Sequence, residues 1–222
     1  MLPTVDIFGF TIAEPTTTVT DYLITAVAWW LGARLVRLRE HALVRRLWAS
    51  GFFFIGLAAL FGGTSHGFAP HLDALQLFYL WKATVYSVGL SMLFAVAGTI
   101  TGAGFPRFIR STLHGLNLAA FAVYAGWMID HSDFIYVIYH YVPAMFSIAL
   151  IQGYEYWRRR ASSAPWLIWG VLVTLLGAVV QRSGFTLHPH FNHNDLYHLI
   201  QVAGLILLHR GAVLIEPSGR IE

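Results

Sequence analysis

The chain has 222 residues, of which 57% are hydrophobic and only 11% are charged, and its mean hydropathy is +0.61. These values predict an all-α, polytopic integral membrane protein, and no linker is long enough to separate a second domain from a single domain spanning residues 1–222. The absence of cysteine excludes disulfides and thiolate metal sites. The net charge of +3 comes from short arginine clusters between apolar runs, so we expect no nucleic-acid partner.

Apolar runs of about 20 residues, the length that crosses a bilayer, predict seven transmembrane helices. Asp21 and Arg34 lie near the two ends of the first run, where we expect them to reach the membrane interface. The predicted spans are Thr17 to Val36, Leu47 to Phe68, Leu75 to Ile100, Phe108 to Ile129, Phe134 to Trp157, Trp166 to Val180 and Leu196 to Ile215.

The arginines predict the orientation of these spans, because positively charged loops stay in the cytoplasm. They concentrate in alternate connections and at the C-terminal end, whereas the other connections contain only Arg182. We therefore expect the N-terminus outside, the C-terminus in the cytoplasm and a location in a bacterial cytoplasmic membrane. The residues of the positive set are Arg37, Arg39, Arg45, Arg46, Arg107, Arg110, Arg158, Arg159, Arg160, Arg210 and Arg220.

Most histidines of the chain fall at one predicted end of the helices, on the non-cytoplasmic side. Histidine is a common metal ligand, and a group of histidines at the edge of the lipid points to a site rather than to a surface. His41, His114 and His209 lie towards the other end. The clustered set is His66, His71, His131, His140, His188, His190, His193 and His198.

Four of these histidines are the candidate metal ligands. His66 ends the second predicted span within Gly62 to Gly67, where small residues allow close helix approach. His140 lies on a polar stripe of the fifth span with Pro143 and Ser147, which we expect to face the bundle interior. His193 and His198 open the seventh span, and they converge only if His193 precedes the regular helix or the first turn is distorted.

This layout resembles that of the alkaline ceramidases and, more distantly, the adiponectin-receptor-like hydrolases. The resemblance rests on seven helices, an external N-terminus, His66 at the end of the second span, and the histidines that open the seventh. It implies a zinc ion held by three histidines and hydrolysis of a lipid amide. Imidazole ligands also suit iron or copper, and a metal-bound hydroxide could attack an ester as well as an amide. His66 and His198 match two ligand positions, whereas Asn194 stands where the family has its third histidine.

The chemistry of a metal-activated water calls for further residues near the ion. A carboxylate, Asp73 or Asp195, would transfer the proton, and Ser65 or Tyr136 would donate a hydrogen bond to the developing oxyanion. The partner would be a lipid substrate or a small hydrophobic ligand, bound on the non-cytoplasmic side.

Lys82, the only lysine of the chain, lies inside the third predicted span, where an isolated charge is costly. Three roles fit this position: a snorkelling side chain, a partner of a carboxylate or headgroup, and a Schiff-base lysine.

Two other classes of function fit the same pattern. A redox protein would use facing histidines as haem or copper ligands. A receptor or transporter would use the polar, histidine-lined interior to bind a ligand without turnover.

Overall fold

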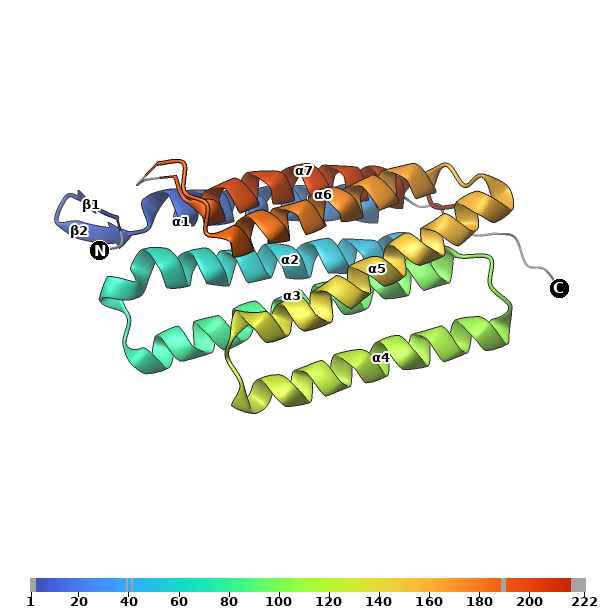
Figure 1. Ribbon diagram of the computed structural model, residues 1–222, viewed down its shortest axis with the longest axis horizontal. Helices are drawn as coiled ribbons and strands as arrows, with labels where there is room; N and C mark the ends of the chain where they lie inside the picture. The colour runs from blue at the N-terminus through green and yellow to red at the C-terminus, as the bar shows by residue number, and fades with distance from the viewer. Residues whose placement is uncertain (1–2, 39, 41, 189–190, 217–222) are drawn as a thin grey trace.

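The computed structural model describes residues 3–38, 40, 42–188 and 191–216. Seven long helices lie side by side along one axis, and a small hairpin caps one end of the bundle (Figure 1). Arg39, His41, His190 and Arg220, which contribute to the sequence arguments, lie outside the described residues.

Each predicted span corresponds to one helix, with ends that differ by a few residues. The seven helices are α1 Pro15–Arg37, α2 Ala42–Phe68, α3 Ala74–Gly102, α4 Arg107–Asp130, α5 Phe134–Arg159, α6 Ser163–Ser183 and α7 His193–Val213. A 3-10 turn, η1 Ala69–His71, joins α2 to α3. Among the described residues, six helices, α2 to α7, are long and apolar enough to cross a membrane.

The hairpin at the N-terminal end was not expected from an all-α prediction. Strands β1 Thr4–Ile7 and β2 Phe10–Ala13 pair antiparallel. Phe8 and Gly9 both have positive φ, 54° and 82°, which is the backbone of a two-residue hairpin turn. His71 of η1 stacks on Phe10 with ring centroids 3.9 Å apart, and its Nε2 lies 2.8 Å from the carbonyl oxygen of Thr11. The hairpin is therefore attached to the α2–α3 connection.

Helix α1 packs between α2 and α7, whereas α4 lies at the edge of the bundle against α3 and α5 (Figure 1). In α4 only Tyr124 and Met128 are buried. The shared apolar core includes Trp48, Val85, Ile148 and Leu167, and α4 contributes Tyr124 and Met128 to it.

Lys82 caps the end of a neighbouring helix. Its Nζ donates to the carbonyl oxygens of Met128, Ile129 and His131 at 2.5, 3.2 and 2.7 Å. These carbonyls belong to the last turn and the C-cap of α4, which have no donors within the helix. The ammonium therefore supplies the bonds and the positive charge that a helix C-terminus favours.

Candidate functional site

A cavity of about 260 Å³ lies inside the bundle near the hairpin end, and six helices contribute to its wall. Its polar lining consists of Asp21 from α1, His66 from α2, Thr84 from α3, Gln181 from α6, and Asn194, Tyr197, His198 and Gln201 from α7. The apolar part of the wall includes Ile55, Trp81, Val88 and Phe134. We call this space the outer cavity.

His198 lies in the wall of the outer cavity and contacts α1 through both ring nitrogens. Its Nδ1 lies 2.8 Å from the Thr20 hydroxyl, and its Nε2 lies 3.3 Å from Oδ1 of Asp21. The Thr20 hydroxyl also lies 3.0 Å from the carbonyl oxygens of Thr16 and Thr17. When its proton is donated to one of these carbonyls, Thr20 accepts a hydrogen bond from Nδ1–H of His198.

The tautomer of His198 determines which group faces Asp21. A ring with its proton on Nε2 donates to the carboxylate, whereas a neutral imidazole with its proton on Nδ1 has a lone pair on Nε2. That lone pair is directed to a carboxylate oxygen, which also accepts hydrogen bonds. Two acceptors in contact repel one another unless a proton or a cation lies between them. Asp21 is only 6% exposed, and its carboxylate lies in the wall of the outer cavity.

His66 has a comparable outer partner. Its Nδ1 lies 3.1 Å from Oε1 of Glu14, the residue that precedes α1. A carboxylate accepts but does not donate, so Nδ1 of His66 carries a proton, and in the neutral ring Nε2 has the lone pair. The hydrogen bond from His66 lowers the pKa of the Glu14 carboxyl below its ordinary value, although partial burial acts in the opposite direction.

Glycines of α2 allow α1 to come close enough for these contacts. A Cβ atom on Gly63 would lie 2.7 Å from Cβ of Asp21, and one on Gly67 would lie 2.6 Å from Oγ1 of Thr18. Neither distance is possible without a shift of the helices. The sequence prediction that the small residues around His66 permit close helix approach is therefore confirmed.

Helices α1 and α7 run parallel and in register at the site. Thr17 donates to Oδ1 of Asp195 at 2.9 Å, and Thr20 contacts His198, so both pairs are separated by 178 residues. Asp195 also accepts from the backbone N–H of Asn192 at 2.7 Å, and Asn192 in turn caps the first turn of α7. Asp195 is buried and fixes the start of α7 against α1.

Of the four predicted metal ligands, His66 and His198 line the outer cavity, whereas His193 and His140 do not. His193 is the first residue of α7, faces Glu14, and has a buried Nδ1 without a hydrogen-bond partner among the described residues. His140 stacks on Tyr124 of α4 with ring centroids 4.4 Å apart. The expected inward stripe is wrong in part, because Pro143 is exposed and the buried face of α5 contains Val137, Tyr141, Met145 and Ile148.

The three predicted catalytic residues also lie outside the lining of the outer cavity. Asp73 is exposed, and its carboxylate caps α3 by accepting from the backbone N–H of Gln76 at 2.8 Å. Ser65 is half-buried on α2 beside His66. Asp195 accepts from Thr17 and Asn192.

Sequence reasoning missed two carboxylates of the site. The expectation that Asp21 reaches the membrane interface is wrong, because its side chain is buried against His198. A carboxylate inside an apolar run was the available signal, since such a residue is functional by default. Glu14 could not be assigned in the same way, because it precedes the apolar run.

Within the described part of the chain, no group of three or more His, Asp or Glu side chains is arranged to hold a metal ion. The donor set nevertheless fits one in its chemistry. It combines two imidazoles and a carboxylate, which suit zinc, iron or copper, and the gap between Nε2 of His198 and Oδ1 of Asp21 is one that a proton or a cation would bridge.

A family model described as a family of unknown function, DUF6962, matches residues 16–217. The match covers all seven helices. No curated protein and no solved structure matches the chain.

Proposed function

The chain belongs to the DUF6962 family, and we propose that it is a metal-dependent membrane hydrolase whose outer cavity binds the ion. His198 and Asp21 are the first two donors, and His66 is the third. One observation carries the proposal: Nε2 of His198 faces Oδ1 of Asp21 at 3.3 Å while Nδ1 is held by Thr20.

The distance between these two atoms supports a shared ion. Zinc binds imidazole nitrogen and carboxylate oxygen at about 2.0–2.2 Å, so two adjacent donors of a tetrahedral site lie roughly 3.3 Å apart. A bound cation would remove the repulsion between the two acceptors.

The outer partners of both histidines provide a second line of support. Histidines that bind a metal through one ring nitrogen usually donate the other N–H to a carboxylate or another acceptor, which fixes the tautomer and the ring. Glu14 has this relation to His66, and Thr20 has it to His198. The acceptors come from the start of α1, so α1 orients both rings.

The wall of the outer cavity suits a lipid amide or ester. A zinc ion, when bound, lowers the pKa of its water to about 7 and polarises a carbonyl. Trp81, Phe134 and Val88 offer an apolar surface for hydrocarbon, while the amides of Gln181 and Asn194 offer hydrogen bonds to a polar headgroup. Asp21 is positioned to accept a proton in the cavity, a role that the exposed Asp73 does not support.

Metal analysis tests the assignment of the site. We expect about one ion per chain in the detergent-purified protein and in His140→Ala, and a loss of most of the metal in His198→Ala and Asp21→Asn. His140→Ala is the matched control, because it removes a histidine from the same end of the bundle but outside the cavity. Equal metal content in all four proteins would contradict the proposal.

An activity assay tests the reaction. The purified protein is incubated with a panel of lipid amides and esters, before and after treatment with a chelator. We expect cleavage that the chelator abolishes and that added zinc restores. Cleavage that survives complete metal removal would exclude the metal as the source of the nucleophile.

A receptor or transporter is the second candidate, because no three donors are arranged around a common point in the described residues. In that case a proton lies between His198 and Asp21, and the cavity binds its ligand without turnover. A metal-free wild-type protein that binds a lipid and releases it unchanged would favour this function.

We further propose that all seven helices cross the membrane, with the hairpin and the outer cavity on the non-cytoplasmic side. Helix α1 is less apolar than the others, but Asp21, Thr17 and Thr20 direct their polar groups to α7 rather than to lipid. The arginines of alternate connections support this orientation.

A further inference from the structure

Arg45 differs from the other arginines of the chain in its surroundings. It lies in the first turn of α2 and is only 6% exposed, whereas the other described arginines are exposed or half-buried. Its Nε is buried and has no hydrogen-bond partner, and no ion pair between described residues includes this side chain. Within the described part of the chain, Arg45 is therefore a buried cation without a counter-ion.

The described acidic residues at this end of the bundle do not supply that counter-ion. Glu155 already accepts from Nε of Arg159 at 2.5 Å. Glu40 and Glu216 are exposed and take part in no ion pair among the described residues. An isolated buried charge is strongly destabilising, because it loses its hydration and gains no partner. Arg45 therefore calls for an anion from another source.

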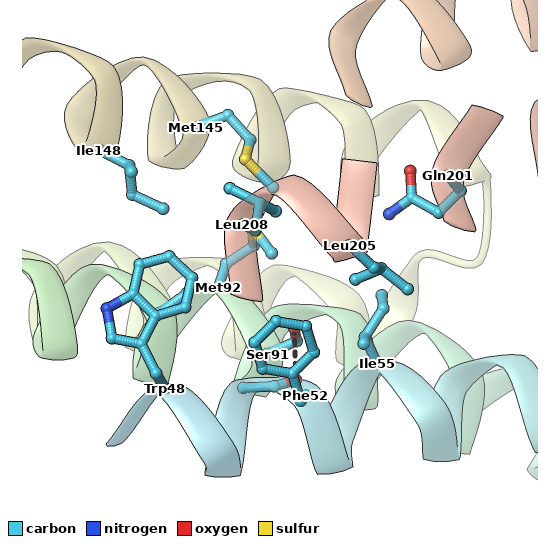
Figure 2. Close-up of a pocket in the computed structure, with 12 residues that line it drawn as sticks. Trp48, Phe52, Ile55, Ser91, Met92, Met145, Ile148, Gln201, Leu205 and Leu208 are labelled. Carbon is cyan, nitrogen blue, oxygen red and sulfur yellow. Dashed lines mark hydrogen bonds between the residues drawn. The ribbon is translucent and has the colours of Figure 1, made fainter. Parts of the chain in front are cut away.

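The interior of the bundle beside Arg45 is apolar. Trp48, about one turn further along α2, and Phe52 line a cavity of about 20 Å³, and Leu205 and Leu208 of α7 lie opposite them (Figure 2). The lining of this cavity contains no charged side chain. Long side chains of a helix point back towards its N-terminus. The guanidinium of Arg45 is therefore directed to the end of the bundle where α2 begins, and an anion reaches it from there.

The start of α2 adds to the attraction for an anion. The first backbone N–H groups of a helix have no acceptor within it, and the helix dipole makes this end positive. The first turn of α2 has no acidic residue, and Arg46 follows Arg45. The last turn of α1, which packs against α2, contains Arg34 and Arg37. Positive charge and free N–H donors are therefore concentrated around the buried guanidinium.

A phosphate group matches these donors. The planar guanidinium donates to two phosphate oxygens at once, and the N–H groups of a helix N-terminus bind the remaining oxygens. We propose that Arg45 and the first turn of α2 bind a phosphate group at the end of the bundle opposite the hairpin. The phosphate belongs either to an anionic phospholipid of the adjacent leaflet or to a soluble ion. The proposal does not rest on metal binding or on hydrolysis.

Removal of the charge tests whether Arg45 lacks a partner within the protein. Arg45→Met keeps an apolar stem but removes the guanidinium. In maltoside detergent without lipid or phosphate, we expect the Tm of this variant to equal or exceed that of the wild type, because an unpaired buried charge does not stabilise the fold. A lower Tm, or a failure to fold, would show that the charge has its partner within the chain and would overturn the proposal.

Added ligands then test the site and identify the source of the phosphate. Phosphatidylglycerol is compared with diacylglycerol, which lacks the phosphate, and inorganic phosphate is compared with sodium chloride at equal ionic strength. We expect one phosphate compound to raise the Tm of the wild type by about 3–6 °C relative to its comparison compound. A rise with phosphatidylglycerol alone identifies a lipid phosphate, and a rise with inorganic phosphate identifies a soluble ion.

Two variants show whether this rise depends on Arg45. It should disappear in Arg45→Met. Arg107→Met is the matched control, because it removes an exposed arginine from the first turn of another helix, α4, and it should keep the rise. The proposal is refuted if neither phosphate compound raises the Tm of the wild type, or if Arg45→Met shows the same rise.

Discussion

At the scale of single residues, Lys82 is a structural cap whose removal should be costly. Lys82→Met keeps the apolar stem but leaves three carbonyls of α4 without their charged donor. We expect a loss of about 2–3 kcal/mol in the free energy of unfolding, because hydrogen bonds to charged groups contribute about 1.5–3 kcal/mol. Chemical denaturation in mild detergent would measure it.

Tyr86→Phe is the control for Lys82→Met. Like Lys82, Tyr86 lies on α3 and donates to α4, where its hydroxyl contacts the carbonyl oxygen of Ala125 at 3.1 Å. A neutral donor to one carbonyl should be worth about 1 kcal/mol. If Tyr86→Phe destabilises the protein as much as Lys82→Met, the capping role of Lys82 is refuted.

Also at this scale, the hydrogen bond between Glu14 and His66 should make stability depend on pH. The pKa of the Glu14 carboxyl is lowered in the folded protein, so this carboxyl releases its proton more readily there than in the unfolded chain. The stabilisation is therefore complete above the ordinary pKa of 4.5 and is lost as the pH falls through the lower, folded value. Groups facing Glu14 are His66 from α2, His193 from α7 and Asp21 from α1.

Glu14→Gln isolates this contribution. We expect the variant to have a lower Tm than the wild type at pH 7, and the difference between the two proteins to shrink as the buffer is made more acidic than pH 4.5. Thermal unfolding across this pH range checks it. A difference that stays constant, or that grows in acid, would show that the charge of Glu14 does not contribute to stability.

At the scale of secondary-structure elements, the contact between α1 and α2 determines whether the outer cavity exists. Gly63→Val places a branched side chain against Asp21 of α1, so the helices must separate. We expect a fall in Tm and a loss of metal, because Asp21 moves away from His198. Gly126→Ala of α4 is the control, since a Cβ there meets nothing within 4 Å. It should be neutral or stabilising, because alanine favours a helix over glycine by about 1 kcal/mol.

At the scale of the whole molecule, the absence of cysteine makes the topology directly measurable. A single cysteine replaces Phe8, which is exposed at the hairpin turn, or Ser162, which is exposed between α5 and α6. With seven spans and an external N-terminus, a membrane-impermeant maleimide should label intact cells that carry Phe8→Cys but not those that carry Ser162→Cys. Lysed cells should be labelled in both cases. Labelling of Ser162→Cys in intact cells would contradict the proposed orientation.

Much of the helical framework could be predicted from the residues, because a chain in lipid must satisfy its backbone hydrogen bonds within each span. The run predicted from Leu75 to Ile100 is helix α3, Ala74–Gly102, and the run from Phe134 to Trp157 is α5, Phe134–Arg159. His66 and His198 were also predicted to share a pocket, and both line the outer cavity. Hydropathy predicted the helices, and the placement of histidine together with the family resemblance pointed to these two residues.

The partners of these histidines were decided by tertiary packing. Hydropathy distinguishes lipid from water, but it does not specify which helices become neighbours or which faces meet. Only the close, parallel approach of α1 to α7 brings Asp21 and Thr20 to His198, and only the glycines of α2 bring Glu14 and α1 to His66. For the same reason the capping role of Lys82 could not be predicted, because it depends on the end of α4 lying beside α3. The role of a buried polar group depends on its hydrogen-bond partner, and here that partner lies on another helix.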